Sequence, residues 1–336
     1  MKVKIMTIFA IIWLVIAVLG IIPSNKDIIA PGGLTKVESL IEVEGETQIS
    51  GSFNTIYVYS MERVSVLAAA IASLIDGVDV SDSSNSVHLS DEENIKSGQI
   101  QKNQSLEAGL ICAYTEANKI NSNISIEYDF TGFIVYIYQI NNEIFEMGDI
   151  ITKVYDKSND KTYNASNKEE LRSALSELSI GDKINILRNG EDKEITIEKE
   201  FNNNNLNRFA CYEKYEIKSA SPAFNLHQSN TLGPSGGLLQ TLSIYSQITG
   251  IDLTYGKKIA GTGTIEVDGT AGPIGGISQK IITAINNDAD VFLCPSYHFD
   301  EAYKTYMKTK NHEKMVLIEV TTFADAVAKL NELYAN

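Results

Sequence analysis

The chain has few of the residues that mark disulfide frameworks and metal centres. Its 336 residues include three cysteines and four histidines. The cysteines are odd in number and far apart, which predicts neither a disulfide framework nor a cluster of metal ligands: Cys112, Cys211 and Cys294. The net charge is −15, from 28 basic and 43 acidic residues, and the basic residues gather in no patch or stripe. Nucleic acid is therefore not an expected partner, and no metal or other cofactor is expected.

A nucleotide-binding loop is also missing. No Gly-x-x-x-x-Gly-Lys-Ser/Thr segment occurs in the sequence, and that motif is what cradles the phosphates of a bound nucleotide. We therefore expect no nucleotide as a partner.

The sequence contains one long apolar run. Residues 5–22 form an uncharged apolar run of 18 residues, just long enough to span a bilayer. Lys2 and Lys4 flank its short side, which predicts a cytoplasmic N-terminus. A cleavable signal peptide is the alternative, but there is no A-x-A-like cleavage site, and the run is longer than most signal sequences need. The expectation is a single-pass anchor in a cell membrane, with the bilayer as a partner and residues 25–336 outside the cytoplasm.

Two helix starts carry the candidate chemistry. The segment Gly233-Pro234-Ser235-Gly236-Gly237 precedes apolar residues at helical spacing that end at Gly250. Ser235 would lie in the first turn, where free backbone N–H groups can stabilise an oxyanion. The segment Gly275-Gly276-Ile277-Ser278-Gln279-Lys280 predicts a second helix start, with Lys280 in its first turn.

A serine and a lysine brought together in this way can form a nucleophile and its base. A lysine can take a serine proton if burial lowers its pKa towards neutrality. From spacing alone, a plain helix cap and a solvated lysine explain the same residues. A third interpretation is an anion-binding helix start, as in a small-molecule kinase. His227 lies close before Ser235 in the sequence but has no acidic partner in the motif, so we expect a surface histidine.

The two segments resemble the proteolytic domain of Lon proteases. Gly233–Gly237 is similar to the Gly-Pro-Ser-Ala-Gly motif around the Lon nucleophile. Ala260–Ile265, Gly272–Gly276 and Lys280 are similar to the central strand and the lysine-bearing helix of that domain. The resemblance covers roughly residues 210–330 and implies a serine protease with Ser235 as nucleophile, Lys280 as general base and Thr262 supporting the lysine. Gly233, Pro234 and Gly236 would form the oxyanion and substrate loop.

Two departures and one further expectation accompany this resemblance. Gly236 stands where Lon proteases usually have alanine, and the residues before Gly233 lack the acidic residue of many Lon enzymes, so no function is assigned to them. Lon domains often assemble, so a homo-oligomer is a further expectation. Lon enzymes normally carry an ATPase, and this chain has none.

Residues 126–200 resemble a PDZ domain of the type found in bacterial proteases. The pattern includes Gly148-Asp149, a capping box at Ser166-x-x-Glu169 that opens a helix over 167–178, and an Asn189-Gly190 hairpin turn. PDZ domains bind an extended peptide as an added strand. The residues that would border this groove are equally well explained as core: Phe133, Ile134, Val135, Leu171 and Leu175.

The expected fold is α/β (α+β): a Lon-type proteolytic domain and a small β-rich PDZ domain behind an N-terminal transmembrane helix. The boundaries are an anchor over 1–24, a mixed scaffold over 25–125, the PDZ-like domain over 126–200, an Asn-rich linker over 201–209 and the proteolytic domain over 210–336. Within the scaffold, the composition predicts a helix over 64–74 and an exposed polar loop over 81–104, followed by a helix over 106–118. Residues 259–267 predict one continuous strand.

Together these features predict an ATP-independent, membrane-anchored bacterial endopeptidase that cleaves flexible peptides or protein segments outside the cytoplasm. The PDZ domain would recruit substrate or control its access. The alternative is a catalytically inactive scaffold that only binds peptides.

Overall fold

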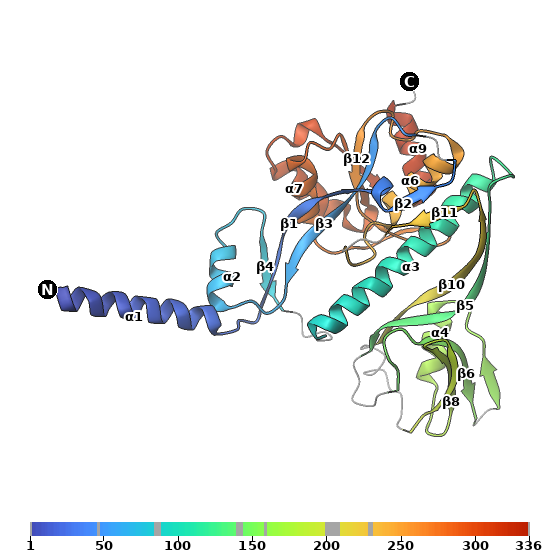
Figure 1. The fold of residues 1–336 in the computed structure, drawn as a ribbon, viewed down its shortest axis with the longest axis horizontal. Coiled ribbons are helices and arrows are strands. Elements are labelled where there is room, and N and C mark those ends of the chain that lie inside the picture. The colour runs from blue at the N-terminus through green and yellow to red at the C-terminus, as the bar shows by residue number, and fades with distance from the viewer. Residues whose placement is uncertain are drawn as a thin grey trace.

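The computed structural model describes residues 2–45, 48–83, 89–138, 144–157, 160–198, 209–227 and 231–334. The fold is mixed α/β, with a larger α/β domain, a smaller β-rich domain and an N-terminal helix that projects from the body (Figure 1). Of the expected Asn-rich linker over 201–209, only Phe209 lies among the described residues.

A six-stranded sheet lies at the centre of the larger domain, in the order β16-β15-β12-β3-β1-β4. The pairs β16–β15, β15–β12 and β12–β3 are parallel, whereas β1 pairs antiparallel with both β3 and β4. The strands are β1 (Lys26–Lys36), β3 (Ser52–Met61), β4 (Asp79–Asp82), β12 (Lys258–Gly261), β15 (Val291–Pro295) and β16 (Val316–Val320).

This sheet contains strands from both sides of the expected boundary between a scaffold over 25–125 and a proteolytic domain over 210–336. Strand β3 pairs with β12 from Ser52–Lys258 to Thr55–Gly261, so strands from both segments share one sheet. The reason is that β12 needs a neighbour on each side, and the N-terminal segment supplies one of them. The two segments form a single domain.

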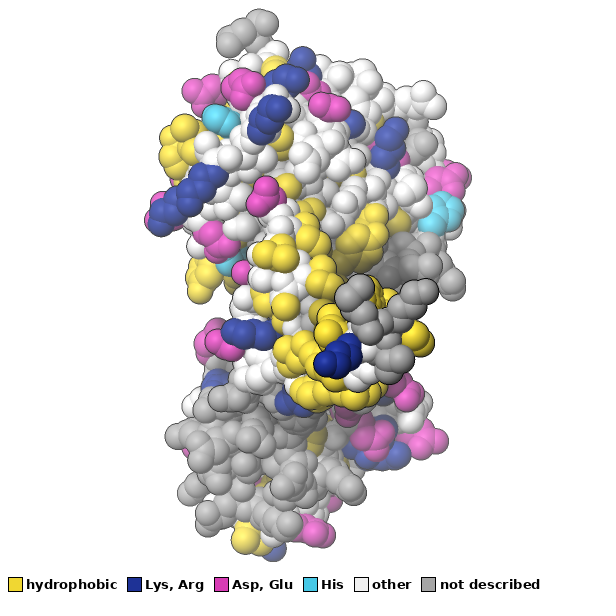
Figure 2. Space-filling model, turned by 90° about the vertical axis from the view of Figure 1, so that its left-hand side faces the viewer, with side chains coloured by type: hydrophobic (Ala, Val, Ile, Leu, Met, Phe, Trp, Pro, Cys, Tyr) yellow, Lys and Arg dark blue, Asp and Glu magenta, His cyan; other side chains and the backbone are white. Residues whose placement is uncertain are grey.

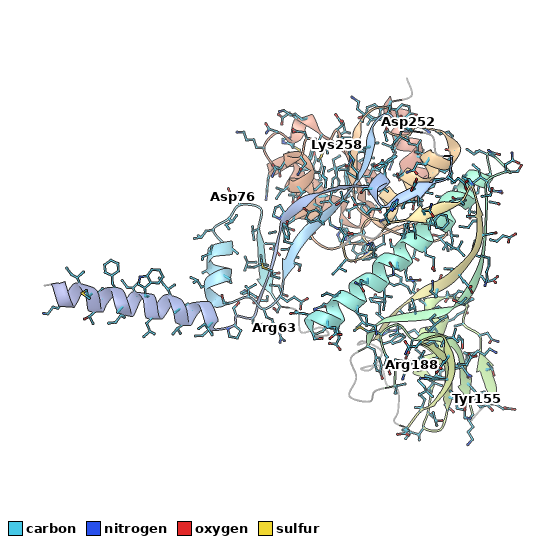
Figure 3. All side chains as sticks on the ribbon, viewed as in Figure 1. Arg63, Asp76, Tyr155, Arg188, Asp252 and Lys258 are labelled. Carbon is cyan, nitrogen blue, oxygen red and sulfur yellow. The ribbon has the colours of Figure 1, made fainter. Side chains whose placement is uncertain are left out.

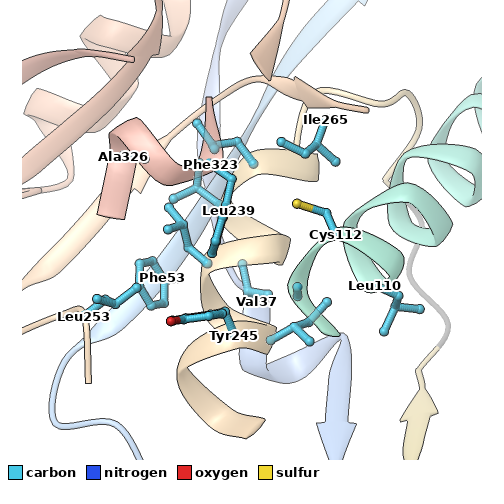
Figure 4. Packing of buried hydrophobic residues seen from close by; sticks show 14 of the residues in the cluster. Val37, Phe53, Leu110, Cys112, Leu239, Tyr245, Leu253, Ile265, Phe323 and Ala326 are labelled. Carbon is cyan, nitrogen blue, oxygen red and sulfur yellow. The ribbon is translucent and has the colours of Figure 1, made fainter. Parts of the chain in front are cut away.

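Helices cover both faces of the sheet. Alternate residues of β12 show the two layers, since Ile259 belongs to one buried cluster and its neighbour Ala260 to another. The first cluster joins α3, α6 and α9, and Figure 4 shows Phe53, Leu239 and Phe323 meeting there. The second lies under α7 and α8. The helices are α3 (Asp91–Asn118), α6 (Gly237–Thr249), α7 (Ile277–Asn286), α8 (Phe299–Lys308) and α9 (Phe323–Tyr334).

Helix α3 replaces most of the polar loop that the composition predicts over 81–104. It begins at Asp91 behind a complete capping box, in which the Ser90 side chain accepts from Glu93 N and the Glu93 carboxylate accepts from Ser90 N. One side of this helix packs against α6, so tertiary contacts override its polar composition. The helix expected over 64–74 is present as α2 (Val66–Ala72).

The smaller domain is a second sheet, in the order β10-β5-β6-β8-β9 with β7 beside β6. The long antiparallel pair β5–β10 connects it to the larger domain (Figure 1), so it is an insertion between α3 and β11. The Asn189-Gly190 hairpin turn is confirmed between β8 and β9. The elements are β5 (Ser125–Tyr138), β6 (Ile150–Asp156), β7 (Lys161–Tyr163), α4 (Lys168–Ser176), β8 (Lys183–Arg188), β9 (Glu191–Thr196) and β10 (Phe209–Ser221).

Inside this domain, a buried ion pair holds the loop before β6 against β8. Arg188, labelled in Figure 3, donates to both carboxylate oxygens of Asp149 at 2.9 and 2.7 Å. Helix α4 starts one residue later than the capping box predicts. Asn167 caps it by accepting from Glu170 N at 2.9 Å, while the Ser166 N–H donates to the Glu170 carboxylate.

Of the two explanations for the residues that would border a peptide groove, the structure fits the core better. Four of them are buried in the core of this domain: Phe133, Val135, Leu171 and Leu175. Ile134 is only partly buried, but it pairs with Tyr212 of β10 on one side and Ile150 of β6 on the other. A peptide cannot add as a strand beside β5 here, because both edges of this stretch are already hydrogen-bonded.

The remaining elements are short, apart from the N-terminal helix. The expected strand over 259–267 is split at Thr262 and Gly263 into β12 and β13. The short elements are η1 (Val37–Ser39), β2 (Ile41–Val43), β11 (Phe224–Leu226), β13 (Thr264–Ile265), β14 (Ala271–Gly272), η2 (Ser296–His298) and η3 (His312–Lys314).

Helix α1 (Lys2–Ile21) is the only helix among the described residues that is long and apolar enough to cross a membrane. Its window Lys4–Ile21 has a mean hydropathy of 2.5, and none of it is buried against the rest of the chain. A membrane anchor and a signal sequence both have these properties.

Candidate active site

Ser235 lies in the turn that leads into α6. Helix α6 begins at Gly237, and Gly236 is its N-cap residue. The turn needs a residue with positive φ at its start, and Gly233 provides it at φ +85°. Ser235 is therefore presented at the N-terminal end of α6, where the helix dipole is positive.

Helix α3 holds this turn from the other side. Gly98 O accepts from Gly233 N at 2.9 Å, and the Ser105 hydroxyl donates to Pro234 O at 2.8 Å. Gly98 has to be small, since a Cβ on it would lie 2.9 Å from Leu232 Cβ. These contacts come from a segment that the sequence predicts to be a loop. The Ser90-x-x-Glu93 capping box is the feature of the sequence that could have predicted the start of α3.

The backbone of Ser235 is tied to the end of β12. Its carbonyl oxygen accepts two hydrogen bonds, from Gly263 N at 2.9 Å and from Thr262 Oγ1 at 3.1 Å. Thr262 N in turn donates to Leu293 O of β15 at 3.1 Å. The strand thus splits at Thr262 and Gly263, and both residues bind the turn that carries Ser235, which we call the nucleophile turn after the expected role of this serine.

Lys280 lies in the first turn of α7 and points into the protein. Only 3% of its surface is exposed, and its Nζ donates to Thr262 Oγ1 at 3.0 Å. Burial lowers the pKa of Lys280 from 10.5 to about 7, because the charged ammonium loses its hydration. No salt bridge formed between described residues involves Lys280, so nothing offsets that loss.

Thr262 is buried and links the lysine to the serine. A hydroxyl has one proton to donate and can accept through its lone pairs. Thr262 donates to Ser235 O and accepts from Lys280 Nζ, so both capacities are used. A neutral lysine amine in this position keeps its lone pair free to accept another proton.

The Ser235 hydroxyl makes no hydrogen bond to any of the described residues, including Lys280. The series of hydrogen bonds from Lys280 through Thr262 therefore reaches the backbone carbonyl of Ser235 and not its hydroxyl. Unliganded catalytic sites often have long nucleophile–base contacts that shorten when substrate binds.

The N–H groups of Ser235 and Gly236 donate to no partner among the residues that the structure describes. Such groups are expected at a helix start, since the first turn has no preceding carbonyls. By contrast, Gly237 N donates to Pro234 O, and Leu238 N donates to Gly263 O. The two free donors beside the Ser235 side chain are suited to an oxyanion.

The structure explains why glycine stands at position 236. A Cβ on Gly236 would lie 2.9 Å from Thr55 Cγ2 of β3 and 3.3 Å from Gln240 Nε2. The contact from Thr55 is closer than packed side chains normally allow, so alanine does not fit beside this threonine. Sequence reasoning missed Thr55 because it comes from the N-terminal segment.

A narrow cleft adjoins the nucleophile turn. It is lined by Pro234, by Thr264–Val267 beyond Thr262, by Gln104 and Ser105 of α3, and by Tyr212, Glu213 and Tyr215 of β10. The β-rich domain thus forms part of its wall. Lys168 of α4 reaches across and pairs with Glu266 at 3.1 Å.

The other candidate residues lie outside this arrangement. His227 is exposed and lies 3.4 Å from Glu42. His298 accepts from Ile274 N at 3.0 Å and faces the loop before α7. All three cysteines are free. The described residues hold no group of three or more His, Cys, Asp or Glu side chains that could bind a metal ion.

Part of the chain matches a known protein family. Residues 196–330 match the family model of the Lon protease (S16) C-terminal proteolytic domain. A Lon protease of Campylobacter jejuni is 30% identical over 95 residues, which is 28% of this chain and 12% of that protein. The chain therefore spans about an eighth of the length of this relative. It contains a Lon-type proteolytic domain, and this domain indicates a serine peptidase.

Proposed function

We propose that the protein is a serine endopeptidase in which Ser235 is the nucleophile and Lys280 is the general base. The observation that carries the proposal is the burial of Lys280, which lowers its pKa to about 7. Lys280 is hydrogen-bonded to Thr262, and Thr262 is hydrogen-bonded to the backbone carbonyl of Ser235. A lysine with this pKa is substantially neutral at neutral pH and can take a serine proton, whereas an exposed lysine stays charged.

In the proposed reaction, the neutral amine of Lys280 takes the proton from Ser235 Oγ as this oxygen attacks the scissile carbonyl. The free N–H groups of Ser235 and Gly236 hold the oxyanion of the tetrahedral intermediate. The Lys280 ammonium then returns the proton to the leaving amine, and water hydrolyses the acyl-enzyme with Lys280 again as base. Thr262 acts as a positioning residue, because it keeps the lysine nitrogen near the serine turn.

The proposal includes membrane anchoring and independence from ATP. The exposed apolar helix α1 supports an uncleaved single-pass anchor with residues 25–336 outside the cytoplasm of a bacterial cell. The absence of a phosphate-binding loop from the sequence supports cleavage without ATP. The substrates would then be peptides or flexible protein segments outside the membrane.

We also propose that the β-rich domain is PDZ-like and recruits substrate, but at a different strand from the one predicted. Strand β10 is the outermost strand of its sheet, next to α4, whereas β5 is paired on both sides. Tyr212 and Tyr215 of β10 line the same cleft as Pro234. A peptide held along β10 would therefore arrive beside the nucleophile.

The test is mass spectrometry of an unstructured peptide library incubated without ATP with the detergent-solubilised chain. Ser235→Ala and Lys280→Ala forms serve as matched controls. We expect the parent alone to cleave, and the cut sites would give its sequence preference. Cleavage by Ser235→Ala at the rate of the parent would disprove the assignment of the nucleophile.

A catalytically inactive peptide-binding scaffold is the second candidate, and the unengaged Ser235 hydroxyl is the observation that favours it. A fluorophosphonate probe separates the two functions. Labelling of the parent and not of Ser235→Ala supports the enzyme. Peptide retention with neither labelling nor cleavage supports the scaffold.

A further inference from the structure

The end of α2 and the turn that follows it expose large apolar side chains. The buried residues of the helix are the small Ala69 and Ala72, whereas Ile71, Leu74 and Ile75 at and after its end are 53%, 85% and 53% exposed. A surface helix of a soluble domain normally turns its larger apolar residues towards the core. The exposed side of α2 is therefore suited to contact something apolar outside the chain.

The sequence around α2 has the composition of such a contact. From Val64 to Ile75 there is no charged residue, and the charges that bracket this stretch are Arg63 and Asp76. In Figure 3 these two residues lie at opposite ends of the α2 segment. We call Ile71, Leu74 and Ile75 the α2 face.

The α2 face is joined directly to the end of α1. Val66 N donates to Ile22 O at 3.0 Å, Ser24 N donates to Val64 O at 2.8 Å, and Val64 N donates to Lys26 O at 3.0 Å. These backbone bonds place the first turn of α2 next to the last turn of α1. The position of α2 is therefore set by the same segment that leaves the apolar helix.

The direction of α2 fits a surface at right angles to α1. In Figure 1, α1 runs horizontally and α2 runs across that direction at its end. Figure 2 looks along α1 from its free end and shows hydrophobic side chains around this helix and above it, over the part of the molecule where Figure 1 places α2. A bilayer crossed by α1 would meet α2 lying along its surface.

We propose that the α2 face is a second membrane contact, in which α2 lies in the interfacial layer of the bilayer that α1 crosses. Ile71, Leu74 and Ile75 enter the boundary between headgroups and acyl chains. The proposal rests on the proposed anchoring by α1. Lipid is the occupant because the face continues from the apolar helix through the backbone bonds to Ile22 and Lys26.

This contact would give the protease domain a fixed orientation. A single spanning helix lets an attached domain rotate and tilt, whereas two contacts from different elements restrict both motions. The nucleophile turn is held by α3 and β12, which belong to the same domain as α2. Its distance from the bilayer would thus be constant, and extended segments emerging from the membrane surface would be within its reach.

The test uses the full chain in phosphatidylcholine–phosphatidylglycerol vesicles, with and without brominated acyl chains, which quench nearby fluorophores. Trp13 is the one tryptophan of the chain and lies in α1, so its own fluorescence reports on the anchor. A bimane label on Leu74→Cys reports on the α2 face. The matched control is the same label on Tyr297→Cys, since Tyr297 is 77% exposed in η2. The unmodified chain under the same labelling gives the blank for the native cysteines.

We expect brominated lipid to quench Trp13 and the label at position 74, and to leave the label at position 297 unchanged. Quenching of Trp13 with equal, weak quenching at 74 and 297 would keep the anchor and overturn the α2 contact. Quenching at 74 without quenching of Trp13 would keep the α2 contact and remove the anchor, whereas quenching at neither would overturn both. A label at 74 that becomes buried only as protein density rises would assign the face to a second copy of the chain and overturn the proposal.

Discussion

Lys280 donates a 3.0 Å hydrogen bond to Thr262, and this bond joins two segments that the short strands β13 and β14 and the loop before α7 separate in the sequence. The lysine is buried and its partner is neutral, so the contact holds the nitrogen in place, but no opposite charge among the described residues compensates for the lost hydration of the ammonium. Its pKa of about 7 follows from this environment. The first two predictions concern that value.

Cleavage should rise with pH through about 7, because the base form of Lys280 is the active one and its pKa is about 7. The measurement is kcat/KM for a fluorogenic peptide between mildly acidic and alkaline pH, with folding checked at each point. A rate that does not change across neutral pH would contradict Lys280 as the base.

Replacing Lys280 by methionine should stabilise the fold, and more at pH 6 than at pH 10. The pKa of Lys280 is about 7 in the folded chain against 10.5 when exposed, so unfolding takes up a proton between these values and stability from this group rises with pH. The burial of the charge below pH 7 costs roughly 5 kcal/mol, and this cost is gone in the variant. Urea unfolding of both forms at the two pH values measures the difference in unfolding free energy. An equal difference at both pH values would show that the pKa of Lys280 is not lowered.

Thr262→Val should lower kcat with little change in KM. The variant loses the acceptor for Lys280 Nζ and one of the two donors to Ser235 O. A hydrogen bond of this kind contributes about 1.5–3 kcal/mol, or roughly a 10- to 150-fold loss in rate. Thr262→Ser keeps the hydroxyl and serves as the matched control, so equal activity of the two variants would remove the positioning role.

Gly236→Ala should destabilise the chain by about 1–3 kcal/mol, because its Cβ would crowd Thr55 Cγ2 at 2.9 Å. Thr55→Ser removes that methyl and keeps the hydroxyl that donates to Thr35 O. The double variant should therefore recover most of the loss, which a double-mutant cycle on unfolding free energies measures. Additive effects of the two substitutions would mean that contact with Thr55 is not the reason why alanine is unfavourable at position 236.

The local sequence predicts those features that depend on neighbouring residues. Gly233 and Pro234 set the turn before α6, Gly250 ends this helix with a left-handed φ of 72°, and Asn189-Gly190 closes a hairpin. The motif order also places Ser235, Thr262 and Lys280 in one site. These features are predictable because proline fixes its own φ and glycine can adopt a positive φ at no steric cost, whatever surrounds them.

Features that depend on distant residues are those where sequence reasoning failed. The composition of residues 81–104 predicts a polar loop, yet most of this segment belongs to α3, whose Gly98 and Ser105 hold the nucleophile turn. The pattern at Phe133–Val135 predicts a groove, yet β5 is paired on both edges there. In both cases a partner remote in sequence satisfies the backbone or covers the side chains.

The sequence by itself singled out the candidate residues, a serine and a lysine at two helix starts, and the segment that is apolar enough to cross a membrane. Only the tertiary structure decided that the N-terminal strands complete the six-stranded sheet, that Lys280 is buried beside a neutral hydroxyl, and that the β-rich domain forms a wall of the cleft. The reason is physical, since burial, strand pairing and a lowered lysine pKa are properties of the surroundings of a residue, and these surroundings exist only once distant segments have packed together.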